Sequence, residues 1–156
     1  MRAGAAAAYH LELCRDPRQR HGVPHTTNRS AFRDCDASEP SFRLYTLLVA
    51  IELALKDKIS PFRSGHDLHR LAGFAVVPMS PGLSTQLTGL TACLGVLLCT
   101  SLQGLQVPVD PANYPGLRYI RHDRDFPGAS SETSVKQALD TARQLVQELR
   151  LAGVDL

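Results

Sequence analysis

The segment from Ser41 to Ile59 constrains the fold more than any other part of the chain, because it is the longest apolar stretch without a helix breaker. Placed on a helix at about 100° per residue, it is apolar on two opposite faces. One face collects Leu44, Leu47, Leu48, Ile51, Ala54 and Leu55, and the other collects Phe42, Val49 and Leu53. A helix of this kind is usually buried among other helices. The segment therefore predicts a central helix over residues 42–58.

Composition indicates a single globular domain. The chain has 156 residues, of which 44% are hydrophobic and 21% are charged, values typical of a protein with one sizeable core. We expect one helical domain over residues 1–156, with its core in residues 38–153. The net charge of +2 is too small to imply nucleic-acid binding by itself. Basic residues are nevertheless concentrated in residues 15–33 and 118–124.

The cysteine pattern and the hydropathy predict a cytoplasmic protein. The four cysteines show no CxxC spacing, and neither a disulfide framework nor a secretory signal is evident. The apolar stretch from Leu90 to Leu105 is interrupted by polar residues and is shorter than a membrane span requires. No association with a membrane is expected.

Four or five helices are predicted along the chain. Residues 1–15 form a weak first helix, and residues 16–37 form a long basic loop or arm, or alternatively a disordered surface insertion. Ser38 is the expected N-cap of the central helix, with Pro40 in its first turn. A short helix follows Gly65 within residues 62–75, and Asp67 is its expected cap or lies in its first turn.

The two remaining helices have the strongest amphipathic patterns. Leucines spaced mostly by three and four, from Leu83 to Leu105, predict the buried face of a helix over residues 83–106, which ends before Pro108. The last helix is expected over residues 134–152, with a capping box formed by Ser134 and Gln137 and with Gly153 as its stop. Its predicted buried stripe is Val135, Ala138, Leu139, Ala142, Leu145, Val146 and Leu149. Strand-type alternation does not persist anywhere. The sequence therefore predicts an all-α fold, an up-down helical bundle of four to five helices.

The first candidate site is a polar strip on the central helix, formed by Tyr45, Glu52 and Lys56. Glu52 and Lys56 are four residues apart with the acid first, which is the favourable order for a helical ion pair. One interpretation is a salt bridge at the margin of the bundle. The other is a buried pair that orients a neighbouring catalytic or binding group, since buried ion pairs are rarely kept for stability alone.

The second candidate is the run Gly65-His66-Asp67-Leu68-His69. Histidines three residues apart on a helix face are suitable for binding a metal, but only two ligands are evident. The alternative is that Asp67 caps the short helix while His66 packs or hydrogen-bonds locally. We expect neither a metal nor another cofactor.

The third candidate lies in residues 118–124, where Arg118, Arg121, His122 and Arg124 suit a phosphate-rich partner. An arginine and a histidine can together cleave RNA without a metal. The histidine moves the 2′-hydroxyl proton, and the arginine stabilises charge on the transition state. The alternative is a solvated charged turn with internal acidic partners.

Taken in order, the runs IELALKDKI, GHDLHRL and NYPGLRYIRHD resemble the HEPN domain family. The resemblance spans residues 41–124. It implies an α-helical bundle that forms homodimers. It further implies either a metal-independent endoribonuclease of a toxin–antitoxin or defence system, or a non-catalytic module. Such a module would partner a minimal nucleotidyltransferase or an antitoxin, or would be a dimeric helical interaction protein.

The resemblance also implies which residues form the site. It places six residues around one internal polar site, namely Glu52, Lys56, His66, Asp67, Arg118 and Tyr119, with Arg121 and His122 at its edge or at a dimer seam. As a ribonuclease, the protein would use His122 as acid and base and Arg118 or Arg121 as phosphate clamp. Three residues separate Arg118 from His122, whereas the family motif has four to six. RNA or a nucleotide is the expected ligand.

Overall fold

A computed structural model describes residues 40–59, 61, 65–75, 77–100, 103–119 and 131–156. These residues contain four α-helices, a two-stranded sheet and a 3-10 helix. In chain order the elements are α3 (Pro40–Asp57), α4 (Leu68–Phe74), α5 (Pro81–Gly95), β1 (Leu98–Thr100), β2 (Gln106–Pro108), η2 (Tyr114–Tyr119) and α6 (Ser131–Leu151). The mostly helical fold confirms the predicted all-α class.

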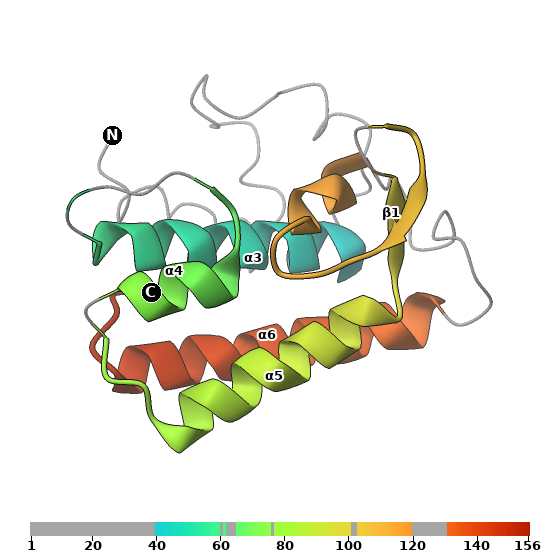
Figure 1. Cartoon of the computed structure of the whole chain (residues 1–156). Coiled ribbons are helices and arrows are strands. Elements are labelled where there is room, and N and C mark those ends of the chain that lie inside the picture. The colour runs from blue at the N-terminus through green and yellow to red at the C-terminus, as the bar shows by residue number, and fades with distance from the viewer. Residues whose placement is uncertain (1–39, 60, 62–64, 76, 101–102, 120–130) are drawn as a thin grey trace, which may run out of the picture.

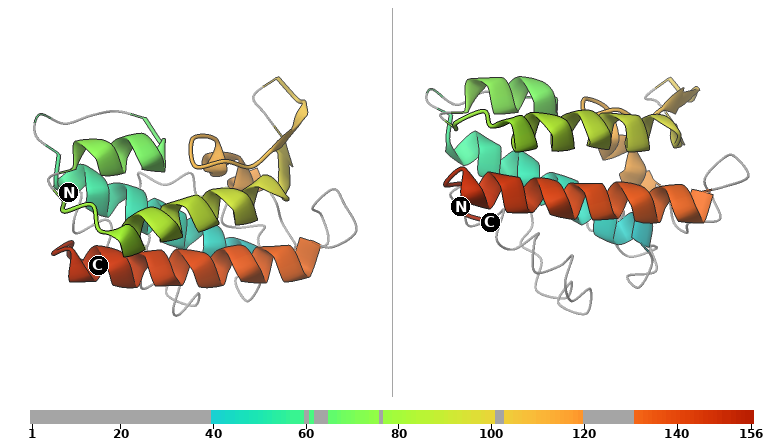
Figure 2. Two further views of the ribbon diagram at one scale, coloured as in Figure 1. Left: turned by 60° about the horizontal axis from the view of Figure 1, so that its bottom comes forward. Right: turned by 90° about the horizontal axis from the view of Figure 1, so that it is seen from below.

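The three long helices form the body of the molecule. Helix α6 packs against both α5 and α3. Figures 1 and 2 show that α5 runs antiparallel to α6, whereas α3 and α6 point the same way. The short helix α4 and the 3-10 helix η2 both pack against α3. Helix α3 is therefore the element to which the later segments are attached.

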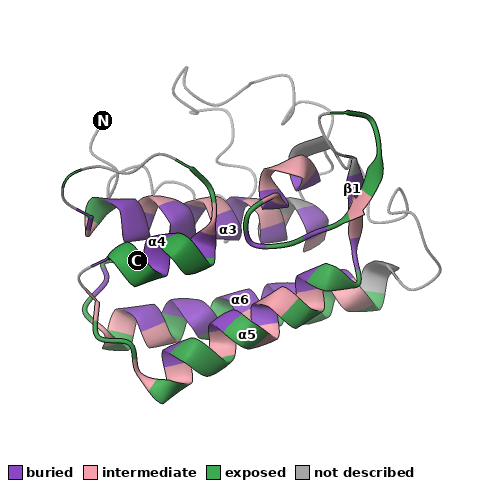
Figure 3. Cartoon of the chain, in the orientation of Figure 1, coloured by how far each residue is buried: buried purple, intermediate pink, exposed green. Residues whose placement is uncertain are grey.

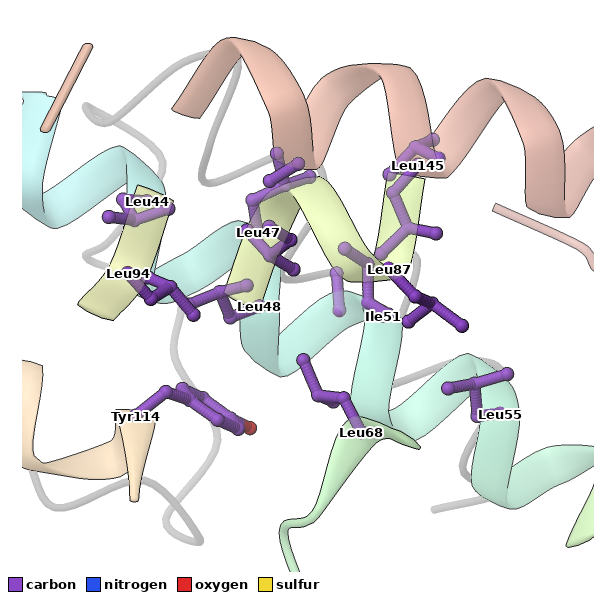
Figure 4. Packing of buried hydrophobic residues seen from close by; sticks show 14 of the residues in the cluster. Leu44, Leu47, Leu48, Ile51, Leu55, Leu68, Leu87, Leu94, Tyr114 and Leu145 are labelled. Carbon is purple, nitrogen blue, oxygen red and sulfur yellow. The ribbon is translucent and has the colours of Figure 1, made fainter. Parts of the chain in front are cut away.

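The core is built from the apolar faces that the sequence predicted. The six residues expected on one face of α3 are all buried: Leu44, Leu47, Leu48, Ile51, Ala54 and Leu55. Figure 4 shows leucines of α3 lying between Leu145 of α6 and the side chains of Leu68 and Tyr114. Buried residues face the interior of the bundle, and exposed residues lie on the outer faces of α4 and α5 (Figure 3).

The predicted helix over residues 83–106 is wrong in its second half. Helix α5 ends at Gly95, and β1 pairs antiparallel with β2, with Cys99 opposite Val107. Leu105, which the helical pattern assigned to the buried face, is 60% exposed. Gly104 has a φ of +77°, a conformation that glycine adopts without strain and that allows the chain to reverse. The regular spacing of leucines continued past the point where the backbone changes direction.

The start of the last helix was also predicted wrongly. Helix α6 begins at Ser131, so Ser134 lies inside the helix and is not its cap. Its predicted buried stripe is confirmed at every position: Val135, Ala138, Leu139, Ala142, Leu145, Val146 and Leu149. Gly153 follows the helix with a φ of +86°, and Val154 N–H donates to the Leu149 carbonyl. This glycine ends the helix as predicted.

Other predictions bear on the first forty residues. Helix α3 does begin at Pro40, as expected for a proline in the first turn. The predicted helix over residues 1–15, the arm over residues 16–37 and the Ser38 cap lie outside the described residues.

The packing of α5 against α6 predicts a large effect from shortening a buried leucine. Leu90 on α5 is fully buried, whereas Leu151 at the end of α6 is 83% exposed. We expect Leu90→Ala to lower the free energy of unfolding by about 2–5 kcal/mol, through lost burial and the cavity left behind. Leu151→Ala, the same chemical change on the surface, is expected to alter it by less than about 0.5 kcal/mol. Urea denaturation of both variants measures the difference, and equal effects would contradict the packing of α5.

Candidate functional site

The centre of the candidate site is an ion pair buried on α3. Glu52 is 5% exposed and Lys56 is 9% exposed. The Lys56 Nζ atom lies 2.5 Å from Glu52 Oε1. The pair is therefore buried and does not lie at a solvated margin. Each charge has lost most of its hydration, so the carboxylate depends on protein donors for stabilisation.

His66 brings the second segment to this carboxylate. Its Nδ1 atom lies 2.8 Å from Glu52 Oε2, across 14 residues of sequence, and its side chain is 56% exposed. The imidazole thus has one edge against a buried acid and the other toward solvent. This contact confirms the predicted convergence of the His66 segment on the polar strip of α3.

Tyr114 is a member of the site that sequence reasoning missed. Its hydroxyl group donates a hydrogen bond to Glu52 Oε2, and the side chain is buried at the start of η2. The sequence held one signal for its burial, which is its spacing of three from Leu117. Three residues is the repeat of a 3-10 helix, so both side chains lie on the same face of η2, and both are buried. We call the four residues Glu52, Lys56, His66 and Tyr114 the Glu52 cluster.

The residues from Gly65 to Leu68 fix the backbone conformation around His66. Gly65 has a φ of +106°, which a residue with a Cβ rarely adopts. Asp67 Oδ1 accepts a hydrogen bond of 3.1 Å from the Arg70 N–H and so caps α4. Leu68 is fully buried. Together these residues hold the backbone on both sides of His66, and they confirm the interpretation of Asp67 as a helix cap.

A hydrogen-bonded turn formed by Asp110 to Asn113 precedes Tyr114 and brings it to the site. Asp110 Oδ1 accepts from the Ala112 and Asn113 N–H groups at 2.7 and 2.8 Å, and Asn113 Oδ1 accepts from the Asp110 N–H at 2.7 Å. The Leu68 N–H donates to the Pro111 carbonyl at 3.2 Å. This backbone bond joins the start of α4 directly to the turn. The segments that carry His66 and Tyr114 are therefore tied to each other as well as to Glu52.

Aromatic rings pack around the tyrosine of the Glu52 cluster. The Tyr114 ring lies 6.4 Å from the Tyr45 ring and 6.4 Å from the His66 ring, which it meets edge-on. Burial, followed by the negative charge of Glu52, raises the pKa of the Tyr114 hydroxyl well above its usual value. Tyr114 therefore stays protonated and remains a donor to the carboxylate.

The geometry limits what each group can do chemically. Three donors occupy the Glu52 carboxylate, so it is poorly placed to accept a substrate proton or to bind a metal. His66 and His69 do not act as a pair, because His69 Nε2 lies 2.6 Å from Thr91 Oγ1 on α5. Within the described part of the chain, no group of three or more potential ligands could hold a metal ion.

The remaining predicted site residues lie at or beyond the end of η2. Arg118 and Tyr119 are the last two residues of this 3-10 helix, the element that begins with Tyr114 and packs against α3. Arg121 and His122 lie outside the described residues. Their assignment as phosphate clamp and acid–base residue stays a prediction.

Comparison of the chain with protein-family models, characterised proteins and solved structures gives no match. Among the helices in the described ranges, none combines the length and the apolar character needed to cross a membrane.

The raised pKa of Tyr114 predicts a specific loss of stability in alkali. Above about pH 10 the unfolded chain releases this phenolic proton while the folded chain retains it, so stability falls as pH rises, by up to about 1.4 kcal/mol per pH unit. Tyr114→Phe lacks this proton. The variant is expected to be about 1–3 kcal/mol less stable near neutral pH, because the buried acid loses a donor. Its deficit relative to wild type should shrink by about 1 kcal/mol between about pH 9 and pH 11.

Urea titrations of both proteins at the two pH values test this expectation. Differences between the proteins cancel the contributions of the other tyrosines and of the lysines. A deficit that stays constant across the pH range would contradict the retention of the Tyr114 proton.

The cap on α4 predicts a graded response at Asp67. We expect Asp67→Ala to lower the free energy of unfolding by about 0.5–2 kcal/mol, since the Arg70 N–H loses its acceptor. Asp67→Asn keeps a suitable cap oxygen and is expected to retain most of the stability. Chemical denaturation measures both values. If the asparagine variant were as unstable as the alanine variant, the carboxylate charge would matter more than the cap.

Proposed function

We propose that this protein is a HEPN-like helical protein that engages the phosphate of RNA or of a nucleotide at the Glu52 cluster. The observation that carries the proposal is the meeting of the three resembling segments at one buried carboxylate. Glu52 and Lys56 come from the first segment, His66 from the second and Tyr114 from the third. The resemblance was drawn from the order of short motifs, and their spatial convergence is independent support for it.

His66 is the member of the Glu52 cluster best placed to meet a ligand, because its side chain is more than half exposed. Lys56 balances the charge of Glu52, so the buried acid does not repel a phosphate group that approaches the exposed imidazole. From the sequence, Arg118 or Arg121 is proposed as a phosphate clamp and His122 as an acid–base residue. If the protein is catalytic, these groups would support cleavage of RNA without a metal. The proposed active form is a homodimer in the cytoplasm.

The second candidate function is a non-catalytic module that partners a minimal nucleotidyltransferase or an antitoxin. The observation that favours it is the saturation of the Glu52 carboxylate by Lys56, His66 and Tyr114. A buried acid that already has three donors can serve mainly to hold segments together. Under this proposal the chain would bind its partner and leave RNA intact.

RNA binding is the decisive first measurement. We expect a fluorescently labelled single-stranded oligoribonucleotide to bind the wild-type protein at low salt in the presence of EDTA, measured by fluorescence anisotropy. His66→Ala should weaken binding by about 10-fold or more, because a hydrogen bond to a charged group contributes about 1.5–3 kcal/mol.

His69→Ala is the matched control. His69 is an exposed histidine on α4, three residues after His66, and its Nε2 contacts Thr91. Its substitution is expected to change the affinity by less than about twofold, which corresponds to a few tenths of a kcal/mol. Absence of RNA binding by the wild-type protein, or equal losses in the two variants, would count against the proposed ligand.

A further inference from the structure

The orientation of the His66 imidazole is defined by its buried partner. Glu52 is a buried carboxylate that accepts from Lys56 and Tyr114, and His66 presents Nδ1 to the same group at 2.8 Å. A carboxylate can only accept, so Nδ1 carries the hydrogen atom. In the neutral ring the lone pair is then on Nε2. An acid that fixes the tautomer in this way leaves the second nitrogen available for proton transfer.

The Glu52 side chain is itself held firmly. It is buried, Lys56 binds one of its oxygens, and the Tyr114 hydroxyl binds the other oxygen together with His66. The carboxylate therefore has no alternative orientation that keeps all three bonds. The backbone beside His66 is held by the conformation of Gly65 and by the Asp67 cap. Both partners of the Glu52–His66 contact are thus ordered before any ligand arrives.

His69 shows the opposite arrangement. Thr91 Oγ1 donates to the Leu87 carbonyl at 3.0 Å and therefore accepts from His69 Nε2–H at 2.6 Å. The outer nitrogen of His69 is thus already occupied. His66 Nε2 has no such partner among the described residues, and its side chain is 56% exposed. The two histidines of α4 and its N-terminal segment are therefore chemically distinct.

We propose that His66 is a catalytic acid–base residue acting through Nε2, with Glu52 as its positioning residue. This inference rests on the proposed function, in which RNA phosphate is engaged at the Glu52 cluster. Among the described residues, the other charged or titratable groups beside the pair are Lys56 on α3, Tyr114 on η2 and Asp67 on the His66 segment. Lys56 and Tyr114 both bond to Glu52, and Asp67 accepts from the Arg70 N–H.

The proposed reaction is transesterification of the RNA backbone. His66 Nε2 removes the proton of a ribose 2′-hydroxyl group, the 2′-oxygen forms a bond to the adjacent phosphorus, and the bond from phosphorus to the 5′-oxygen breaks. The departing 5′-oxygen takes a proton from water. The hydroxide that remains then accepts the proton held on Nε2. The products are a 2′,3′-cyclic phosphate and a 5′-hydroxyl end, and the histidine returns to its starting state.

Cleavage of an end-labelled single-stranded oligoribonucleotide in EDTA tests the proposal, with binding measured on the same samples. The wild-type protein should produce 2′,3′-cyclic phosphate ends from RNA and leave the matching oligodeoxyribonucleotide intact, since DNA lacks the attacking hydroxyl. His66→Ala should lower kcat by about 100-fold or more. His69→Ala should retain the wild-type rate. His66→Ala removes one of the three donors to Glu52, so a thermal melt of the variant verifies that it is folded at the assay temperature.

A second variant tests whether Glu52 acts by orienting the His66 imidazole. Glu52→Gln keeps an acceptor for the imidazole but removes the charge, and is expected to lower kcat by about 10–100-fold with little change in KM. Added imidazole should restore part of the activity of His66→Ala, because it supplies the missing base. It should not restore the activity of Glu52→Gln, which still contains His66.

The outcomes distinguish this inference from the function on which it rests. RNA that binds but is not cleaved, or cleavage unaffected by His66→Ala, would overturn the catalytic role and leave the phosphate-binding proposal standing. Cleavage that EDTA abolishes would overturn it in favour of a metal-dependent reaction. Failure to bind RNA at all would overturn both. Loss of cleavage in His66→Ala with rescue by imidazole would support it.

Discussion

The buried Glu52 carboxylate is the interaction on which the rest of the structure depends. A carboxylate in this position loses its hydration, and leaving it unpaired would cost several kcal/mol. Its three donors come from α3 itself, from the segment before α4 and from the start of η2. Two of these segments must therefore dock on α3 for the charge to be satisfied. One side chain thus couples the local ion pair to the tertiary fold.

Much of the helical fold was predictable because it depends on local periodicity. The buried faces of α3 and α6 were predicted residue by residue, since an apolar stripe on a helix follows directly from its repeat. The end of α5 was not predictable in the same way. Leu94 and Leu97 are spaced as a helix requires and both are buried, yet Leu97 already lies beyond the helix. Spacing alone does not distinguish a helix from a turn that places the next leucine in the same core.

In the candidate site, too, contacts within one helix or turn were predictable from local spacing, whereas contacts between distant segments were not. The pairing of Glu52 with Lys56 follows from a spacing of four on one helix, and the Asp67 cap follows from its position before an apolar run. The contact between His66 and Glu52 was expected only through the resemblance. The Tyr114 contact spans 62 residues and was not expected at all. Its formation depends on the path of the intervening chain, which no local pattern specifies.

That path is set by the end of α5 at Gly95. A helix continued to residue 106 would carry the chain about 16 Å farther along its axis, at about 1.5 Å per residue. Instead the chain reverses at Gly104, and the Val109 N–H bonds to the Leu97 carbonyl at 2.8 Å. The Asp110–Asn113 turn then starts beside the end of α5 and delivers Tyr114 to Glu52. The β1–β2 hairpin, which the leucine pattern had predicted as helix, thus positions the turn that brings Tyr114 to the Glu52 cluster.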